Sequence, residues 1–164
     1  MSTFYVTNIS EEEYLEIYKK QRKQFKESGI FPDIMDYIDP DEIGINGAEK
    51  LFLAEEDVER FSDLDCSIVD HFMDNDEFIE RYFNGEYCID DYFKDNIQFA
   101  SEYWNIYLFL DLPYLEMLLE TYEGYLEEAD KEVDRLHYAH VRRVIKMLIR
   151  YKSKFGLNVA YKRD

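Results

Sequence analysis

Residues 111–156 read DLPYLEMLLETYEGYLEEADKEVDRLHYAHVRRVIKMLIRYKSKFG. Apolar or aromatic side chains recur at steps of three and four from Leu115 to Phe155, which is the period of a helix with one buried face. Gly124 costs about 1 kcal/mol relative to alanine inside a helix, so a bend or a break is expected there. The stretch therefore predicts a long or bent C-terminal helix that forms the spine of the protein.

Both ends of this expected helix carry boundary signals. Asp111 precedes Pro113, which fits a capping residue followed by a proline in the first helical turn, and Gly156 ends the pattern. After Gly156, Leu157–Tyr161 (LNVAY) has the composition of a short strand, and so does Phe4–Ile9 (FYVTNI) at the other end of the chain. We expect these two segments to pair and to tie the two ends together.

A second helix is expected directly after the first strand. Ser10 and Glu13 have the spacing of a capping box, in which each side chain bonds the backbone N–H of the other residue. Acidic residues in the first turn and basic residues in the last suit the helix dipole, and Gly29 ends this helix. Beyond it we expect a turn-rich loop over residues 30–50, one helical turn at Asp33–Ile38, an extended Leu51–Leu53 and a helix over Ala54–Phe61.

A weak internal repeat follows. Residues 70–83 align with residues 91–104 at a shift of 21 positions, with six identities among fourteen positions. Each copy predicts a short helix, a turn at a shared Asp-Asn pair, and a second helix. Two copies do not establish a repeat architecture, which needs three or more, and coincidence in a chain rich in Asp, Phe and Tyr is an equal alternative.

The composition is that of a folded domain. The chain has 164 residues, of which 46% are apolar and 17% aromatic, and it contains only six glycines and three prolines. Disordered acidic chains lack such an aromatic content, and few glycines and prolines favour helices over a turn-rich β protein. We expect one α+β domain over residues 1–164, predominantly helical, with a short terminal β element, several short acidic helices and the long or bent C-terminal helix.

Charge is strongly segregated along the chain. Between Glu27 and Asp134 there are 32 acidic residues and five basic ones, a net charge of −27. From Arg135 to Asp164 nine basic residues stand against one acidic residue, a net charge of +8, and the whole chain carries −18. A field of this sign repels nucleic acid and anionic membranes and attracts basic surfaces of other proteins. We therefore expect a basic nucleic-acid-handling protein as the partner and no direct binding to nucleic acid or membrane. A homodimer that forms through the long helix is also possible.

The basic residues between Arg142 and Arg163 have two interpretations. They either balance the acidic body within the molecule or form a patch for nucleic acid or membrane. The neighbouring acidic region screens such a patch, so the internal role is favoured.

No motif specifies a catalytic reaction. The chain lacks a Gly-x-Ser-x-Gly nucleophile motif and a glycine-rich phosphate loop, which are the local signatures of hydrolases and nucleotide-binding enzymes. Asp74 opens a stretch that begins like an EF-hand calcium loop, but Ile79 stands where that loop needs a glycine. We expect neither enzyme activity nor a cofactor.

The histidines offer a weak metal signal. His137 and His140 lie three positions apart, and Asp134 precedes His137 by about one helical turn. Di-iron bundles use a Glu-x-x-His motif on each of two helices, whereas this chain has a single Asp-x-x-His. Packing and hydrogen bonding are the favoured roles, and no metal site is expected.

Cysteine usage and hydropathy bear on the compartment. Cys66 and Cys88 have neither a metal-binding spacing nor the number that a disulfide framework needs, so we expect two reduced residues that serve packing. The sequence shows no secretory signal peptide and no apolar run approaching the roughly 18 residues of a membrane span. A cytoplasmic location is expected, in the host cell if a phage encodes the protein.

Aromatic and acidic residues alternate through the middle of the chain. Fifteen tyrosines exceed the needs of a core of this size, and exposed tyrosine beside carboxylate makes a good protein-binding surface. Carboxylates that repeat along a helix also imitate the spacing of phosphates. The other interpretation is a solvated acidic face over an aromatic core. We expect the partner-binding surface to consist of Asp63, Asp65, Asp74, Asp76, Glu77, Tyr87, Asp90, Asp91, Tyr92, Asp95, Glu116, Glu120, Glu123 and Glu127.

In composition, the chain resembles small acidic inhibitors of phages and mobile elements, namely the anti-restriction and anti-CRISPR proteins that block nucleic-acid channels. It is equally similar to acidic immunity proteins that neutralise basic nuclease toxins. The likeness involves no alignable motif. It implies an inhibitor that blocks the basic nucleic-acid-binding groove of a bacterial effector by nucleic-acid mimicry. The alternatives are an immunity protein, and a housekeeping or regulatory domain whose acidity serves solubility.

The net charge of −18 predicts a stability that depends on salt. Repulsion among the carboxylates destabilises the compact state, and salt screens that repulsion. The urea concentration at the unfolding midpoint should therefore rise as sodium chloride increases from about 10 to about 300 mM, a range over which the Debye length shortens severalfold. A midpoint that falls with salt would show that most carboxylates are paired in the folded state.

Overall fold

The computed structural model describes residues 3–28, 49–51, 62–104 and 106–162. In chain order the elements are β1 Thr3–Thr7, α1 Glu11–Ser28, β2 Glu49–Leu51, α3 Ser62–Met73, α4 Asp76–Phe83, α5 Ile89–Phe93, α6 Ile97–Trp104, β3 Leu108–Leu110, α7 Leu112–Glu128, α8 Glu132–Ser153 and β4 Asn158–Lys162. This is the expected predominantly helical α+β fold. The turn expected at Asp33–Ile38 and the helix expected at Ala54–Phe61 lie outside the described residues, as does most of the expected loop.

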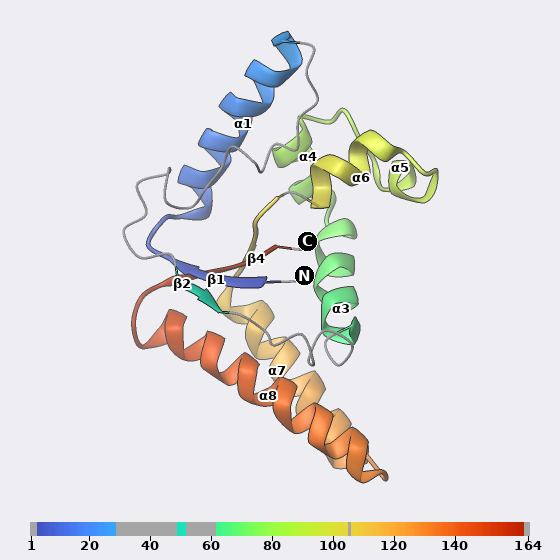
Figure 1. The fold of residues 1–164 in the computed structure, drawn as a ribbon, viewed down its shortest axis with the longest axis vertical. Coiled ribbons are helices and arrows are strands. Elements are labelled where there is room, and N and C mark those ends of the chain that lie inside the picture. Colours follow the sequence, from blue (N-terminus) through green and yellow to red (C-terminus); the bar gives the residue numbers. More distant parts are fainter. Residues whose placement is uncertain (1–2, 29–48, 52–61, 105, 163–164) are drawn as a thin grey trace.

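The four strands form one antiparallel sheet in the order β2-β1-β4-β3 (Figure 1). The first and last strands are neighbours at its centre, in a register that runs from Thr3 opposite Lys162 to Thr7 opposite Asn158. The side chain of Asn158 also donates a hydrogen bond to the carbonyl of Ile9 at 2.7 Å. The expected pairing of the two ends of the chain is confirmed, and β2 begins two residues before the extended segment predicted at Leu51.

Local capping signals place the helices as the sequence predicts. The Ser10 hydroxyl accepts from the Glu13 N–H at 3.1 Å, and the Glu13 carboxylate accepts from the Ser10 N–H at 3.2 Å, so the capping box of α1 is complete. At α7, the Asp111 carboxylate accepts from the Tyr114 N–H at 2.9 Å, with Pro113 in the first turn. Each cap satisfies N–H groups that the first turn of a helix leaves without a partner.

The two halves of the repeat share one capping device. Asn75 Oδ1 accepts from the Phe78 N–H at 3.1 Å, and Asn96 Oδ1 accepts from the Phe99 N–H at 3.2 Å. Both phenylalanines are buried. In each copy a helix, a turn at Asp-Asn and a second helix follow one another, as α3–α4 and as α5–α6, so the predicted layout of both copies is confirmed.

The C-terminal spine is two helices, α7 and α8, packed side by side as a hairpin. The chain turns at residues 129–131 and not at Gly124, which lies inside α7; Ala129 adopts an extended conformation, and its carbonyl accepts a hydrogen bond from Arg135 Nε at 2.8 Å. In the sequence, Val133 and Leu136 continue the helical spacing of apolar residues across this turn, yet both side chains are exposed. Period alone therefore did not distinguish one helix from two.

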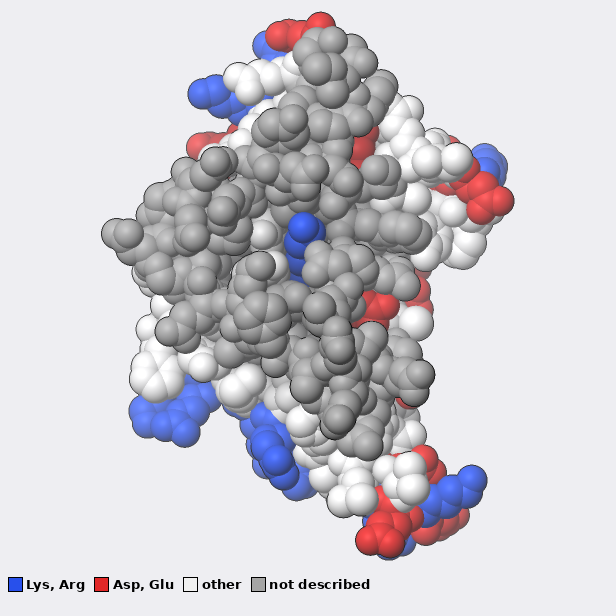
Figure 2. All heavy atoms as spheres, viewed as in Figure 1, with Lys and Arg blue, Asp and Glu red and all other residues white. Residues whose placement is uncertain are grey.

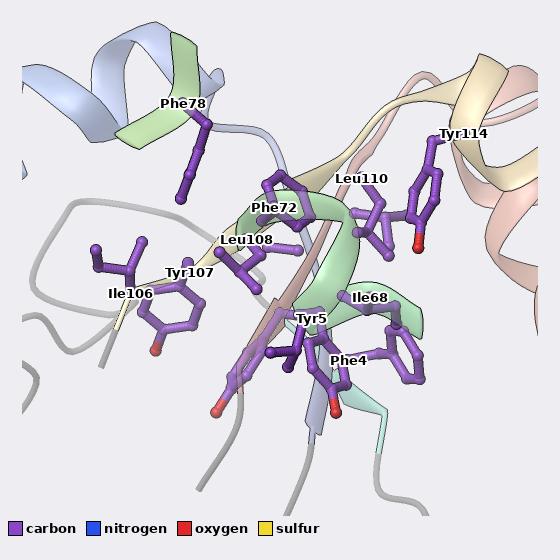
Figure 3. Close-up of a cluster of buried hydrophobic side chains, with 14 of the residues drawn as sticks. Phe4, Tyr5, Ile68, Phe72, Phe78, Ile106, Tyr107, Leu108, Leu110 and Tyr114 are labelled. Carbon is purple, nitrogen blue, oxygen red and sulfur yellow. The ribbon is translucent and has the colours of Figure 1, made fainter. Parts of the chain in front are cut away.

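The core lies between the sheet and the helices (Figure 3). Phe4 and Leu110 of the sheet meet Ile68 and Phe72 of α3 there, together with Tyr114 at the start of α7. The hairpin packs through α8 against β4, with Val141, Val144, Ile145 and Leu148 on its buried side. Among the described residues, no helix combines the length and the apolar character needed to cross a bilayer.

Tyrosine is a core residue in this protein. Of the fourteen described tyrosines, nine are buried and only Tyr125 is exposed. Several buried hydroxyls have backbone partners: Tyr103 donates to the carbonyl of Val69 at 2.9 Å, and Tyr14 accepts from the Tyr107 N–H at 3.1 Å. The expectation that some tyrosines are exposed is met by Tyr125, whereas most of the others pack against one another inside the molecule, with their rings tilted or edge to face.

This burial predicts a cooperative alkaline transition. Burial raises the pKa of Tyr14, Tyr18, Tyr82, Tyr114 and Tyr122 well above the ordinary value. The folded state therefore holds these protons more tightly than the unfolded state, so stability is lost as the pH rises beyond the ordinary tyrosine pKa of about 10. Most of the rise in absorbance near 295 nm should come in a step that coincides with the loss of helical circular dichroism. A rise that reaches its full extent while the helices are still intact would contradict this account.

Candidate functional site

Helices α3 to α6 present an acidic surface. Their exposed carboxylates form no ion pair with any described lysine or arginine, and residues 62–104 contain only two such bases, Arg81 and Lys94. Arg81 is engaged elsewhere, at 3.4 Å from the Glu11 carboxylate. The exposed carboxylates of this surface are Asp63, Asp70, Asp74, Asp76, Glu77, Glu80, Asp90 and Asp95.

The turn between α5 and α6 adds an exposed apolar pair to this acidic surface. Phe93 is 75% exposed and Ile97 is 83% exposed, and the exposed Asp95 lies two positions from each of them in the sequence. In the first copy of the repeat, Phe72 occupies the position of Phe93 and is buried. The two aligned phenylalanines therefore differ in burial, and we call Asp90, Phe93, Asp95 and Ile97 the acidic tip.

The backbone of the acidic tip is well defined by capping. The Asp91 carboxylate accepts from the Cys88 N–H at 2.7 Å, which closes the first turn of α5, and this hydrogen bond lowers the pKa of Asp91. Asp95 has a left-handed backbone with φ of 52°, a conformation that aspartate and asparagine adopt more readily than most residues. The side chains of the tip are therefore presented from a fixed turn.

The structure divides the acids predicted to bind a partner into two groups. Most belong to the α3–α6 surface, whereas Glu116, Glu120 and Glu127 are exposed on α7. Glu123 is half-buried and lies 3.9 Å from Lys146 of α8. Figure 2 shows acidic and basic side chains mixed at the turn between α7 and α8, and basic ones along the C-terminal half of α8.

Besides Glu123, four of the predicted binding residues are partly engaged in the fold itself. Asp91 caps α5, and Asp65 accepts a hydrogen bond from the Tyr161 hydroxyl of β4. Tyr87 and Tyr92 are half-buried and pack against the core. Neither tyrosine of the predicted binding surface is therefore fully exposed. The exposed aromatic ring near them in the sequence is that of Phe93.

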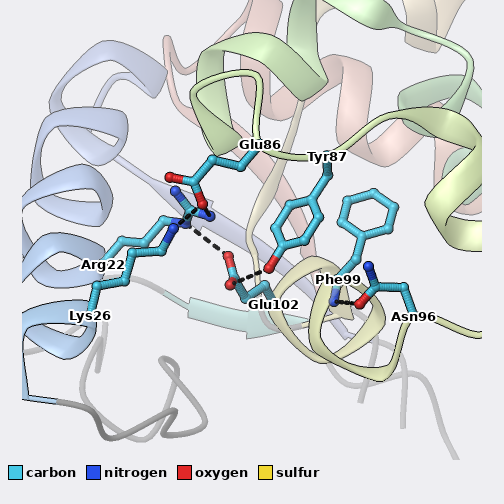
Figure 4. Close-up of polar contacts among 7 residues, drawn as sticks. All are labelled: Arg22, Lys26, Glu86, Tyr87, Asn96, Phe99 and Glu102. Carbon is cyan, nitrogen blue, oxygen red and sulfur yellow. Dashed lines mark hydrogen bonds and ion pairs between the residues drawn. The ribbon is translucent and has the colours of Figure 1, made fainter.

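A buried ionic cluster lies behind the acidic surface and was not anticipated from the sequence (Figure 4). The Arg22 side chain of α1 is 3% exposed, and its guanidinium donates to Glu102 and to Glu86, each at 2.8 Å. Tyr87 donates to the second oxygen of Glu102 at 3.0 Å, and Lys26 also pairs with Glu86. The cluster connects α1 to the segment that leads into α5 and to α6.

Burial decides the energetics of this cluster. Glu102 is 6% exposed and Glu86 is 43% exposed. The guanidinium lies over the rings of Phe83 and Tyr87, at 5.7 and 5.8 Å from their centroids. Burial, and then the neighbouring Glu102 carboxylate, raise the pKa of Tyr87 to about 12, so its hydroxyl remains a proton donor to Glu102 at neutral pH.

The sequence held one signal for this cluster. Arg22 follows Tyr14 and Tyr18 at successive steps of four, so it occupies the buried face of α1 where an apolar residue is expected. A charged residue in that phase requires a buried partner of opposite sign. The identity of the partner, eighty positions later, was not contained in any local pattern.

We find no other cluster that suggests chemistry in the part of the chain that the structure describes. No group of three or more His, Cys, Asp or Glu side chains within the described residues is arranged to hold a metal ion. The thiols of Cys66 and Cys88 are free and exposed, so the expectation that they serve packing is wrong. His71 stacks on Tyr114 with ring centroids 3.8 Å apart, and burial lowers its pKa.

Comparison with protein-family models, with curated proteins and with solved structures finds no match for this chain.

The buried cluster predicts unequal effects for two glutamates that contact the same arginine. Glu102→Gln should lower the free energy of unfolding by about 3 kcal/mol, because it leaves buried charge without full compensation. Glu86→Gln should cost about 1 kcal/mol or less, since that carboxylate is partly solvated. Urea unfolding of both variants measures the difference, and equal losses would contradict the assigned roles.

Proposed function

We propose that this protein is a stoichiometric inhibitor that binds a basic nucleic-acid-handling protein of a bacterial effector system and blocks its nucleic-acid-binding groove. The observation that supports this most directly is the acidic tip, where the exposed apolar pair Phe93 and Ile97 stands among carboxylates. The surrounding α3–α6 surface carries many exposed acids and few bases. This combination suits a protein partner better than a small ligand.

The two kinds of side chain have separate tasks in this proposal. Carboxylates on α3, α4 and α5 pair with lysines and arginines that otherwise hold phosphates, and their long-range field accelerates encounter with a basic partner. Surface ion pairs contribute little net affinity each. Phe93 and Ile97 supply the apolar anchor, since most binding energy in protein interfaces comes from a few well-buried large side chains.

The small size of the acidic tip also favours a second candidate, an immunity protein that neutralises a basic nuclease toxin. Such a protein needs a compact and specific contact more than an extended imitation of a nucleic-acid backbone. The two candidates differ in the partner. An immunity protein protects a substrate from cleavage by one toxin, whereas a groove-blocking inhibitor displaces bound nucleic acid from its target.

Capture followed by competition tests the proposal. Proteins retained from a bacterial lysate by the immobilised chain are purified one by one and loaded with fluorescent DNA or RNA. The protein should release that nucleic acid at a one-to-one ratio, and its affinity should fall steeply between about 50 and 500 mM salt, as charge-steered interfaces do. It should not itself shift DNA or RNA at physiological salt.

Matched variants locate the surface. Phe93→Ala with Ile97→Ala should weaken binding at least about tenfold, the effect of losing an anchor worth more than 1.4 kcal/mol. Asp90→Asn with Asp95→Asn should mainly slow association, and asparagine retains the tolerance for a positive φ at position 95.

The control for the charge change is Glu12→Gln with Glu16→Gln on α1, where both carboxylates are exposed. It also removes two negative charges, but from a different part of the surface. Binding that falls equally in the control and in the tip variant would show that net charge alone matters. A chain that captures no protein able to bind nucleic acid would remove the basis of the proposal.

A further inference from the structure

The α7–α8 hairpin differs in charge from the rest of the molecule. Residues 111–156 contain nine acidic and eight basic residues, a net charge of −1, so the remaining residues carry −17. Within the hairpin the signs are separated by helix. The Glu residues of α7 have no basic neighbour on that helix, and α8 has no acidic residue after Asp134. Two copies of this chain can therefore approach through the hairpin with far less repulsion than through any acidic surface.

The outer face of the hairpin carries both signs in parallel stripes. Leu115, Leu118 and Tyr122 are buried on the inner side of α7, and the exposed Glu116, Glu120 and Glu127 lie on the opposite side, by helical spacing. On α8 the buried side is Val141, Val144, Ile145 and Leu148, and the exposed side carries Arg143, Lys146 and Arg150.

The two stripes are largely unpaired within the chain. Of the described residues, only Lys146 and Glu123 form an ion pair between the helices, at 3.9 Å. Arg150 instead lies over the exposed ring of Phe155, 5.9 Å from its centroid. The interpretation that the basic residues balance acidic residues within the molecule thus holds for Lys146, whereas most of the basic stripe faces solvent.

The same stripes contain apolar side chains and a glycine that the fold of the single chain does not require. Met117 on α7 and Leu136 and Met147 on α8 are exposed. Gly124 lies in the exposed phase of α7, and a Cβ added there would meet nothing within 4 Å. A glycine inside a helix costs about 1 kcal/mol relative to alanine. Space on this side of α7 permits the close approach of a second helix.

We propose that a second copy of this chain docks on this face, so that the protein is a two-fold symmetric dimer. In such an interface the same patch serves both subunits, and the acidic stripe of each α7 lies against the basic stripe of the partner's α8. Gly124 lets the helices approach, and the exposed methionines and Leu136 are covered. Helices α5 and α6, which carry the acidic tip, lie well away from the hairpin (Figure 1), so the dimer leaves the tip accessible.

Sedimentation equilibrium of the full chain tests the dimer directly. At about 150 mM salt, where the Debye length is about 8 Å and long-range repulsion is screened, the mass should be twice 19.9 kDa. Gly124→Gln should raise the dimer dissociation constant at least tenfold while the helical circular dichroism is unchanged. A wild-type chain that stays at 19.9 kDa up to 100 μM, on the order of the weakest specific dimers, would overturn the proposal.

Charge exchange makes the test specific for this face. The acidic-stripe variant is Glu116→Lys with Glu120→Lys, and the basic-stripe variant is Arg143→Glu with Arg150→Glu. Each alone should be monomeric, because like charges then face each other across the two-fold axis. An equimolar mixture of the two should form a dimer again, since every acidic stripe once more meets a basic one.

Two other results would assign the face differently. If both variants stay dimeric, the subunits associate elsewhere and the proposal fails. If the wild-type chain is monomeric but retains duplex DNA or vesicles of anionic lipid, and the Arg143→Glu and Arg150→Glu variant does not, the basic stripe serves an anionic ligand instead of a second copy.

Discussion

The antiparallel pairing of β1 with β4 is the interaction on which the rest of the structure depends. It joins segments from opposite ends of the chain, and each paired strand carries a further strand on its other side. All the helices are connections between these strands, so their positions follow from it. Closing so long a loop costs conformational entropy that grows only slowly with length. The buried side chains of Phe4, Val6, Val159 and Tyr161 stabilise the closed arrangement through hydrophobic burial.

The features that could be predicted from the sequence are those with local causes. Ser10 with Glu13, and Asp111 with Pro113, act within four residues, and their caps form as their spacing indicates. Strand pairing across the whole chain was also predictable, because only two segments had strand-like composition near its ends. In these cases the neighbouring residues alone determine which backbone hydrogen bonds are made.

The features that could not be predicted depend on distant contacts. Nothing local distinguishes Phe72 from Phe93, yet one is in the core and the other is exposed. The partner of Arg22 lies on α6, and the turn after Glu128 continues an apolar period whose later members face solvent. The sign of the candidate surface and most of its acids were predicted from the sequence, but its exposed apolar residues, Phe93 and Ile97, and the buried ionic cluster were not.

Most acidic residues of this protein lie on its exterior, around a core that is rich in tyrosine. Tyrosine fills the interior and bonds its hydroxyls to backbone carbonyls and amides, as at Tyr103 and Tyr14. Those bonds give hydrogen-bond partners to hydroxyl groups that lie inside the core. A rigid aromatic interior also holds short helices in place, although each of them alone is too short to be stable in water. The carboxylates therefore stand on a fixed framework.

The position of β4 in the sheet has a consequence for how the protein is made. A ribosome releases the chain from its first residue onward, and β1 emerges long before the strand that separates it from β3. Until residues 158–162 have left the exit tunnel, β1 and β3 lack their shared neighbour and expose open edges that invite pairing with other chains. The sheet is therefore completed only after residues 158–162 have been synthesised, and the high negative charge of the segments made earlier helps to keep nascent chains apart.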